Sequence, residues 1–295
     1  MPRPQRTYSR AHGWLFRHVP LALRAERLAW FVFVESLQRS MTASPPIVLS
    51  AFAAIARAHL RMKVSDPELR DKLTPDYPAG CKRILFDADY LDALVKPNVT
   101  LITDHVTEIT PSAIRTADGS EHGADVIVYG TGFAAADLLA PIQIRGLDGC
   151  PLSDAWVQGA RAHNGVTVPG FPNLMIMFGP NTALASGSII AMLEPQARYI
   201  RQAVQHLHQS GPGAQLDVRP DVERRYDAEV QARLTDSLWT SCASWYRNAS
   251  GRVVAIWPGT TLEYRRRTSR FDPRAHTVSK PAKQAIGAER EAVPL

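Results

Sequence analysis

The spacing of apolar residues predicts a helical N-terminal region. Residues 13–63 have helical periodicity, and one predicted buried face has members three and four positions apart: Leu49, Phe52, Ile55, Ala56 and Leu60. A Ser-Pro-Pro sequence at 44–46 separates this helix from the preceding one, because proline cannot continue a helix. The longest apolar run, residues 28–34, is far shorter than the roughly 20 residues of a membrane span. We therefore expect it to form a buried helix of a soluble, cytoplasmic protein.

From residue 81 to residue 130 the pattern changes to short strands. The candidate strands are residues 83–86, 99–103, a hairpin over 106–121, and 124–130, with a short helix over 87–95. The run 124–130 (ADVIVYG) is apolar at almost every position, which is typical of a central parallel strand that is covered on both faces. The pattern therefore indicates an α/β fold.

A second strand and helix follow residue 170. Residues 171–179 (FPNLMIMFG) are predicted to form a buried strand that leads into a glycine turn and a helix. The predicted buried stripe of that helix consists of Ile190, Leu193, Ala197, Ile200, Val204 and Leu207. Pro195 interrupts it, so the helix either starts near Glu194 or is kinked. A further helix is expected over about 220–238, and the charged residues 268–295 are expected to be disordered.

Composition and charge bear on the number of domains and on the class of partner. The 295 residues form one large or two smaller domains, and 45% of them are hydrophobic. The net charge of +6 comes from the two ends of the chain, 1–27 and 264–295, whereas the remainder is acidic. Because a nucleic-acid binder usually carries a basic stripe on its folded body, we expect no nucleic-acid partner.

The cysteine and histidine residues add no known metal or hydrolase signature. Cys81, Cys150 and Cys242 are odd in number and far apart, which argues against a disulfide framework and a zinc site and for a reducing compartment. The sequence contains no HExxH and no GxSxG. We therefore expect no metal centre.

Three segments carry candidate chemistry. Lys82 and Arg83 are adjacent, so on a strand they would point to opposite faces. Either they lie in a loop, or both cations hold something anionic. Residues 130–135 read GxGxxA after a predicted strand, which fits either a dinucleotide fingerprint or a simple glycine turn. Residues 178–188 form a glycine turn before a helix, where Ser188 is either a helix cap or a ligand contact.

These segments also carry a family resemblance. The sequences GCKRILFDADYLDAL, NVTLITD, ADVIVYGTGF, PGFPNLMIMFGPNT, SWYRN and WPGTTLEYRRR occur in this order. Together they resemble the C-terminal part of class B flavoprotein monooxygenases, especially Baeyer–Villiger monooxygenases of the arylketone type. The resemblance extends from the first residues to about Arg267.

The resemblance implies site residues for FAD and NADPH. Lys82 would contact the 2′-phosphate of NADPH, and Arg83 would stabilise the anionic, oxygenated flavin and hold the nicotinamide. This division suits the compact charge of lysine and the planar, permanently charged fork of arginine. The remaining cofactor contacts would come from Thr131, Gly132, Phe133, Asn181, Thr182, Ser188 and Trp245, the last of which is otherwise expected to be a core aromatic.

The resemblance also implies a domain layout. Residues 1–78 would be a helical insert of the NADPH domain, 79–122 the C-terminal part of that domain, 123–267 the C-terminal part of the FAD domain, and 268–295 a disordered tail. The fold would be a partial two-dinucleotide-binding-domain flavoprotein fold, since the FAD and NADPH glycine loops of the family are absent from this sequence. The chain is thus expected to be a truncated or split monooxygenase that acts with O₂ on a ketone or a soft heteroatom, with a complementary N-terminal chain as a candidate partner. The alternative is a non-catalytic remnant or a partner-binding half.

Overall fold

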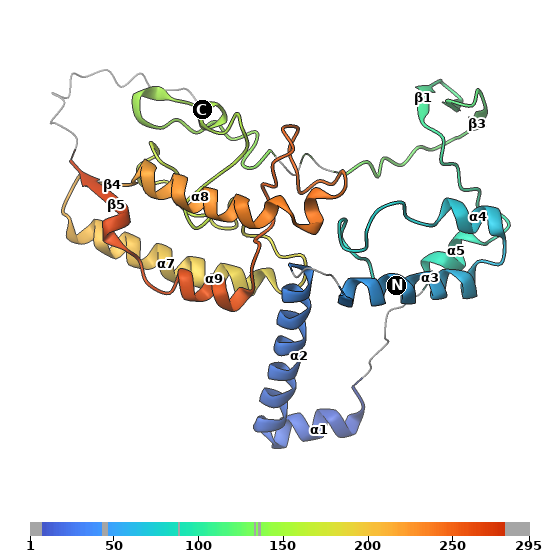
Figure 1. Cartoon of the computed structure of the whole chain (residues 1–295), viewed down its shortest axis with the longest axis horizontal. Coiled ribbons are helices and arrows are strands. Elements are labelled where there is room, and N and C mark those ends of the chain that lie inside the picture. The colour runs from blue at the N-terminus through green and yellow to red at the C-terminus, as the bar shows by residue number, and fades with distance from the viewer. Residues whose placement is uncertain (1–7, 43–46, 88, 133, 135–136, 281–295) are drawn as a thin grey trace, which may run out of the picture. The chain divides into compact units, whose positions relative to one another are not determined.

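The chain consists of two compact units. The computed structural model describes residues 8–42, 47–87, 89–132, 134 and 137–280. Unit 1 comprises Met1–Ala135 with Ser241–Trp245, and unit 2 comprises Ala136–Thr240 with Tyr246–Leu295. Figure 1 shows the helices and strands of both units.

Unit 1 begins with helices, as the sequence predicts. They are α1 (Arg10–His18), α2 (Pro20–Met41), α3 (Ile47–Lys63), α4 (Pro67–Lys72) and α5 (Tyr90–Leu94). The Ser9 hydroxyl accepts a hydrogen bond from the amide of His12 at the start of α1, and the Asp66 carboxylate caps α4 in the same way. The predicted break at 44–46 lies outside the described residues.

The burial predicted for the first helices is wrong in part. Residues 28–34 are helical within α2, but they are not buried, and Leu28, Phe31 and Phe33 are 62%, 43% and 54% exposed. Their apolar side chains point in several directions around α2, and α1 and α3 cover only part of that circumference. On α3, Leu49 and Leu60 are buried as predicted, whereas Ile55 is exposed.

The predicted hairpin is confirmed as a small antiparallel sheet. Its strands are β1 (Val106–Ile109), β2 (Ala113–Thr116) and β3 (Glu121–Gly123), in the order β1-β2-β3. Glu108 lies opposite Arg115, and Arg115 lies opposite Glu121. Arg115 forms ion pairs with both carboxylates, so the cross-strand register is reinforced by charge on the exposed face.

The other strands predicted for unit 1 are not formed. Residues 83–86, 99–103 and 124–130 have no strand assignment, and the supposed central strand 124–130 is strongly exposed. Val126, Val128 and Tyr129 are 79%, 87% and 70% exposed. A strand exists only when a neighbour satisfies its backbone groups, and no described residue pairs with this segment. The described sheets are therefore antiparallel in a mixed α/β chain.

The main elements of unit 2 are the helices α7, α8 and α9 and a two-stranded sheet. Its elements are η1 (Leu147–Gly149), α6 (Leu152–Ala155), α7 (Ile189–Gln209), β4 (Gln215–Val218), α8 (Pro220–Thr235), η2 (Leu238–Thr240), α9 (Thr261–Arg267), η3 (Pro273–Ala275) and β5 (His276–Ser279). In Figure 1, α7 and α9 lie side by side. The core contains fully buried aromatics, among them Trp257, Tyr199 and Tyr264.

A buried polar network joins α7 to α9. The Gln196 side chain on α7 accepts a hydrogen bond from the Phe178 amide and donates one to the Tyr264 hydroxyl on α9. Tyr264 in turn donates to the Asn164 carbonyl at 2.6 Å. These hydrogen bonds connect the Phe178 amide, Gln196, Tyr264 and the Asn164 carbonyl in one series, which fixes the position of the turn that precedes α7.

Three predictions for unit 2 are corrected. Residues 171–179 form only an isolated bridge at Met175, with Phe171 and Ile176 buried. The helix begins at Ile189 and runs through Pro195, so a start near Glu194 is wrong. Its buried face is rotated from the predicted stripe, because the stripe residues Ile190 and Val204 are exposed. The buried members are Met192, Pro195, Gln196, Tyr199 and Ala203.

The predicted disordered tail is partly ordered. Residues 276–279 form β5, which pairs antiparallel with β4 from Gln215↔Ser279 to Val218↔His276. The charged composition of 268–295 did not reveal this pairing, because the interacting partner lies about 60 residues away in the sequence. Residues 281–295 lie outside the described residues.

Candidate functional site

The Lys82–Arg83 pair lies in an irregular segment between α4 and α5. Gly80 has φ +90°, a left-handed conformation that suits glycine, and it makes the turn that precedes the pair. Residues 81–86 form neither helix nor strand, and both cations are exposed. Of the two alternatives that the sequence allows, the loop is therefore confirmed.

Both cations of the pair are available to an anionic ligand. The Lys82 Nζ atom lies over the Tyr77 ring, 4.3 Å from its centroid. Within the part of the chain that the structure describes, neither Lys82 nor Arg83 forms an ion pair. The aromatic face of Tyr77 attracts the ammonium group without neutralising it, so the charge remains for a ligand. Tyr77 was not predicted as a site residue, since a tyrosine in a proline-rich loop carries no signal by itself.

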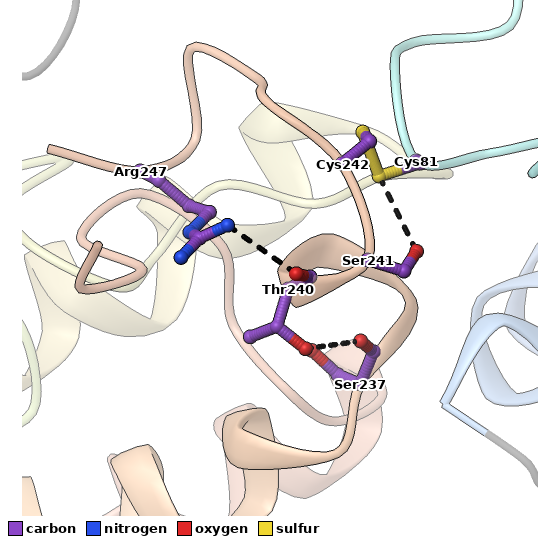
Figure 2. Close-up of a disulfide and its surroundings, with 6 residues drawn as sticks. All are labelled: Cys81, Ser237, Thr240, Ser241, Cys242 and Arg247. Carbon is purple, nitrogen blue, oxygen red and sulfur yellow. Dashed lines mark hydrogen bonds between the residues drawn. A yellow bond between two sulfur atoms is a disulfide. The ribbon is translucent and has the colours of Figure 1, made fainter. Parts of the chain in front are cut away.

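A disulfide anchors this segment to a distant part of the sequence, which corrects the expectation of reduced cysteines. Cys81 is bonded to Cys242, 161 residues away, and Cys150 is free and exposed. Figure 2 shows the bond, with the Ser241 hydroxyl donating a hydrogen bond to Cys81 Sγ at 3.7 Å. An odd count and the lack of a CxxC motif say nothing about which residues meet in space, so the sequence alone did not reveal this pair.

The disulfide brings another predicted residue into the same unit. Residues 241–245 belong to unit 1, whereas the residues on either side of them belong to unit 2. Trp245, three positions after Cys242, is 45% exposed. It is therefore not the core aromatic that local context favoured, and Lys82, Arg83 and Trp245 lie on two segments that one covalent bond connects.

The glycine turn at 130–135 has no fingerprint helix in the described structure. Thr131 and Gly132 are exposed, and Gly132 has φ +93°. In the described residues between 134 and 146 no helix begins, although a phosphate-binding fingerprint needs one directly after the turn. Phe133 lies outside the described residues, as does the last residue of the motif.

Asn181 and Thr182 are structural residues of unit 2. The buried Asn181 amide donates to the carbonyls of Val253 and Ile256, both at 3.0 Å, and its backbone amide donates to Val254. Thr182 is fully buried, and its hydroxyl donates to the Gly179 carbonyl at 2.7 Å. Because these groups already have partners, any ligand contact at this turn has to come from other atoms.

The N-terminus of α7 carries hydrogen-bond donors, namely its first backbone amides and the Ser188 hydroxyl. Ser188 occupies the N-cap position, but its side chain makes no capping hydrogen bond, and it is exposed. The first amides of a helix have no intrahelical acceptor and carry the positive end of the helix dipole. Ser188 and the first turn of α7 therefore present hydrogen-bond donors at the surface of unit 2.

An apolar cavity flanks the Lys82–Arg83 segment within unit 1. It has a volume of about 560 Å³ and is lined by α3 and by residues of the segment 73–91. Most of the lining is apolar, and its polar members include Arg57, His59, Thr74 and Asp87. A cavity of this size and composition is typical of a small-molecule site.

None of the described helices combines the length and hydropathy that a membrane crossing requires. Within the same residues, no group of three or more His, Cys, Asp or Glu side chains is placed to hold a metal ion.

The comparisons with known proteins connect these features. No family model matches the chain. Over 292 residues the chain is 40% identical to a Baeyer-Villiger monooxygenase of Streptomyces coelicolor, covering 98% of this chain and 56% of that protein. Among solved structures, OTEMO in complex with FAD and NADP matches with a TM-score of 0.69 at 26% identity, covering 78% of this chain and 44% of that one.

A second solved structure gives the same result. Cyclohexanone monooxygenase from Rhodococcus sp. Phi1, bound to NADP⁺, matches with a TM-score of 0.70 at 25% identity over 81% of this chain and 46% of that one. The sequence match covers nearly all of this chain, the structural matches cover about four-fifths of it, and each match includes about half of the relative. The chain is therefore a homologue of the Baeyer–Villiger monooxygenases, within the class B flavin monooxygenases, and spans about half of their length.

Proposed function

We propose that the chain is the C-terminal part of an FAD- and NADPH-dependent monooxygenase that inserts oxygen into a ketone or oxidises a soft heteroatom. The observation that carries the proposal is the exposed Lys82–Arg83 pair, whose two charges have no ion-pair partner among the described residues. Relatives of this chain have been crystallised with FAD and NADP, whose phosphates are the anions such a pair would suit.

Lys82 and Arg83 would have different roles. Lys82 carries a compact ammonium charge, which suits the 2′-phosphate that distinguishes NADPH from NADH. Arg83 carries a planar and permanently charged guanidinium, which would hold the nicotinamide side of the cofactor and stabilise negative charge that develops on oxygen. Tyr77 would orient Lys82 through the ring contact at 4.3 Å.

Unit 2 would contribute to the FAD site through backbone rather than side-chain groups. FAD, when bound, would supply the chemistry that activates O₂. The exposed Ser188 and the first turn of α7 would present hydrogen-bond donors to the flavin. Asn181 and Thr182 would keep the preceding turn in place through their buried hydrogen bonds. Thr131, Gly132 and Trp245 would be further contacts on the NADPH side, and Phe133 would join them.

A partner-binding role is the second candidate. The run 124–130 is apolar, unpaired within the described residues and highly exposed, with Val128 87% exposed. Such a segment is suited to pair as a strand with another polypeptide segment, which would satisfy its backbone groups and cover its apolar side chains. If this is the whole role, the chain would associate with an N-terminal monooxygenase portion without itself supporting turnover.

Flavin retention tests the proposed function. The chain by itself should not retain FAD, because without a loop around the pyrophosphate the site loses most of its charge-assisted hydrogen bonds. Joined to the N-terminal portion of the Streptomyces coelicolor relative, it should purify as a yellow protein that oxidises NADPH. Stoichiometric flavin on the chain alone would contradict this division of the site. A folded but colourless joined protein would contradict the function.

A further inference from the structure

The Cys81–Cys242 disulfide joins the two segments of unit 1 that carry the proposed NADPH contacts. Cys81 directly precedes Lys82 and Arg83, and Cys242 lies three positions before Trp245. Both cysteines are thus within a few residues of groups assigned to the cofactor.

Regular secondary structure does not hold these segments together. Residues 79–83 and 241–245 contain neither helix nor strand, so no backbone ladder fixes one against the other. Residues 241–245 also belong to unit 1 while their neighbours on both sides belong to unit 2. In Figure 2 the covalent bond is accompanied by the Ser241–Cys81 hydrogen bond, which is weak because its acceptor is sulfur.

We propose that the Cys81–Cys242 disulfide is a reversible, redox-controlled positioning element that holds residues 241–245, and with them Trp245, at the Lys82–Arg83 segment. In the oxidised state the two segments are fixed together. In the reduced state residues 241–245 are released from residues 79–83. The local release concerns the covalent link between the two segments, whereas its effect on NADPH binding rests on the proposed function.

The disulfide would be reduced by thiol–disulfide exchange with an external dithiol. Cys81 is fully buried and Cys242 is half-buried, so a thiolate from a small dithiol would attack Cys242 Sγ. The protein S–S bond breaks, a mixed disulfide forms between the reductant and Cys242, and Cys81 leaves as a thiolate that takes up a proton. The second thiol of the reductant then attacks the reductant sulfur of the mixed disulfide, so that the reductant closes to its own disulfide and Cys242 is released as a thiol. Two electrons have passed from the dithiol to the protein, and oxidised glutathione reverses the change.

Hydrogen exchange on the full chain, with thiols counted by alkylation and mass spectrometry, tests the proposal. The oxidised chain should show one reactive thiol, Cys150, and the reduced chain three. On reduction, amide exchange in 79–83 and 241–245 should become faster by on the order of tenfold, while α8 stays unchanged. Oxidised glutathione should restore the slow exchange. Because no cofactor is present, this result does not depend on the proposed function.

Two variants sharpen the test. Cys150→Ser removes the exposed free thiol and should respond to the dithiol as the natural chain does. Cys242→Ser should exchange rapidly from the outset and ignore the dithiol. If reduction leaves both segments as slow as before, or if α8 and β4 speed up equally, the bond is not a local positioning element and the proposal is wrong. Three reactive thiols in the presence of oxidised glutathione would also overturn it.

Discussion

Lys82 is the residue at which cofactor preference can be measured most simply. Only NADPH carries the 2′-phosphate that Lys82 is proposed to contact, and charge-assisted contacts are worth about 1.5–3 kcal/mol. In the joined protein, Lys82→Ala should therefore raise the NADPH Michaelis constant by roughly ten- to a hundred-fold and leave NADH almost unchanged. Steady-state kinetics with both cofactors measure this difference.

Lys96→Ala is the matched control for Lys82→Ala. Lys96 is another exposed lysine of unit 1, placed just after α5. Its removal changes the net charge equally but should alter neither Michaelis constant. Equal losses for NADPH and NADH in Lys82→Ala would mean that Lys82 supports the structure of the loop, and the phosphate contact would have to be withdrawn.

His163 should make unit 2 sensitive to acid. Burial, with the nearby His276 and Arg267, lowers the pKa of His163 from 6.5 to about 4, and Asp272 opposes this effect. Because the folded pKa lies below the unfolded one, the unfolded state binds the extra proton, and stability is lost as pH falls from about 6.5 to about 4. Allowing for solvent screening of a partly exposed ring, we expect a loss of about 2 kcal/mol.

Urea unfolding at pH 7 and pH 5 checks this prediction. His163→Gln removes the titrating group and should flatten the dependence of the unfolding free energy on pH. His208→Gln, at an exposed position of α7, should leave it as in the natural chain. An identical pH dependence in all three proteins would show that His163 is not the group responsible.

At the residue scale, the sequence indicated the local conformation of some residues but not which residues meet in space. For the Lys82–Arg83 pair the sequence left two alternatives, a loop or a strand whose two cations both hold an anion, and the pair lies in a loop. The Cys81–Cys242 bond and the Lys82–Tyr77 contact were not predictable, because each depends on which segments meet in space. Asn181 and Thr182 were predicted as cofactor contacts, and the structure shows that their side chains hold the turn.

At the scale of elements, helices were easier to predict than strands. The periodicity of 13–63 and of the α7 and α8 regions predicted helices, because a helix satisfies its own backbone groups. The buried face of α7 was predicted wrongly, since it includes Gln196, whose amide is buried only because Phe178 and Tyr264 provide partners. The β4–β5 pair was missed because strands depend on distant neighbours.

The unpaired run 124–130 leads to a prediction about assembly. When the N-terminal portion of a relative is supplied as a separate chain, Val128→Lys should abolish co-purification, because it places a charge in a segment that would be buried on association. It should leave the stability of the isolated chain within about 0.5 kcal/mol, because Val128 is 87% exposed.

Val157→Lys provides the control for Val128→Lys. Val157 is 76% exposed in unit 2, so the same substitution adds the same charge at a comparably exposed site. It should leave co-purification unchanged. Normal association of Val128→Lys would show that 124–130 is not part of the contact with the N-terminal portion.

At the scale of the whole molecule, the match to relatives explains features that the isolated chain leaves without a role. The chain spans about half of the length of the relatives it matches. The proposed function would place the rest of such a protein and its cofactors on the exposed apolar residues of α2 and of 124–130, and on the cation pair without ion-pair partners among the described residues. The family resemblance in the sequence was confirmed by these matches, whereas the roles of individual residues stay predictions.

Product formation by Arg83→Ala in the joined protein tests the central claim most directly. If Arg83 stabilises negative charge on oxygen during the reaction, its removal should leave FAD bound and NADPH oxidised but shift the products from oxygenated substrate to hydrogen peroxide. Visible spectra, oxygen uptake, peroxide assay and product chromatography on one preparation measure all four quantities. We predict retained flavin with oxygenation reduced at least a hundredfold, on the scale of a lost oxyanion contact. Oxygenated product near the level of the unsubstituted joined protein would contradict the proposed site.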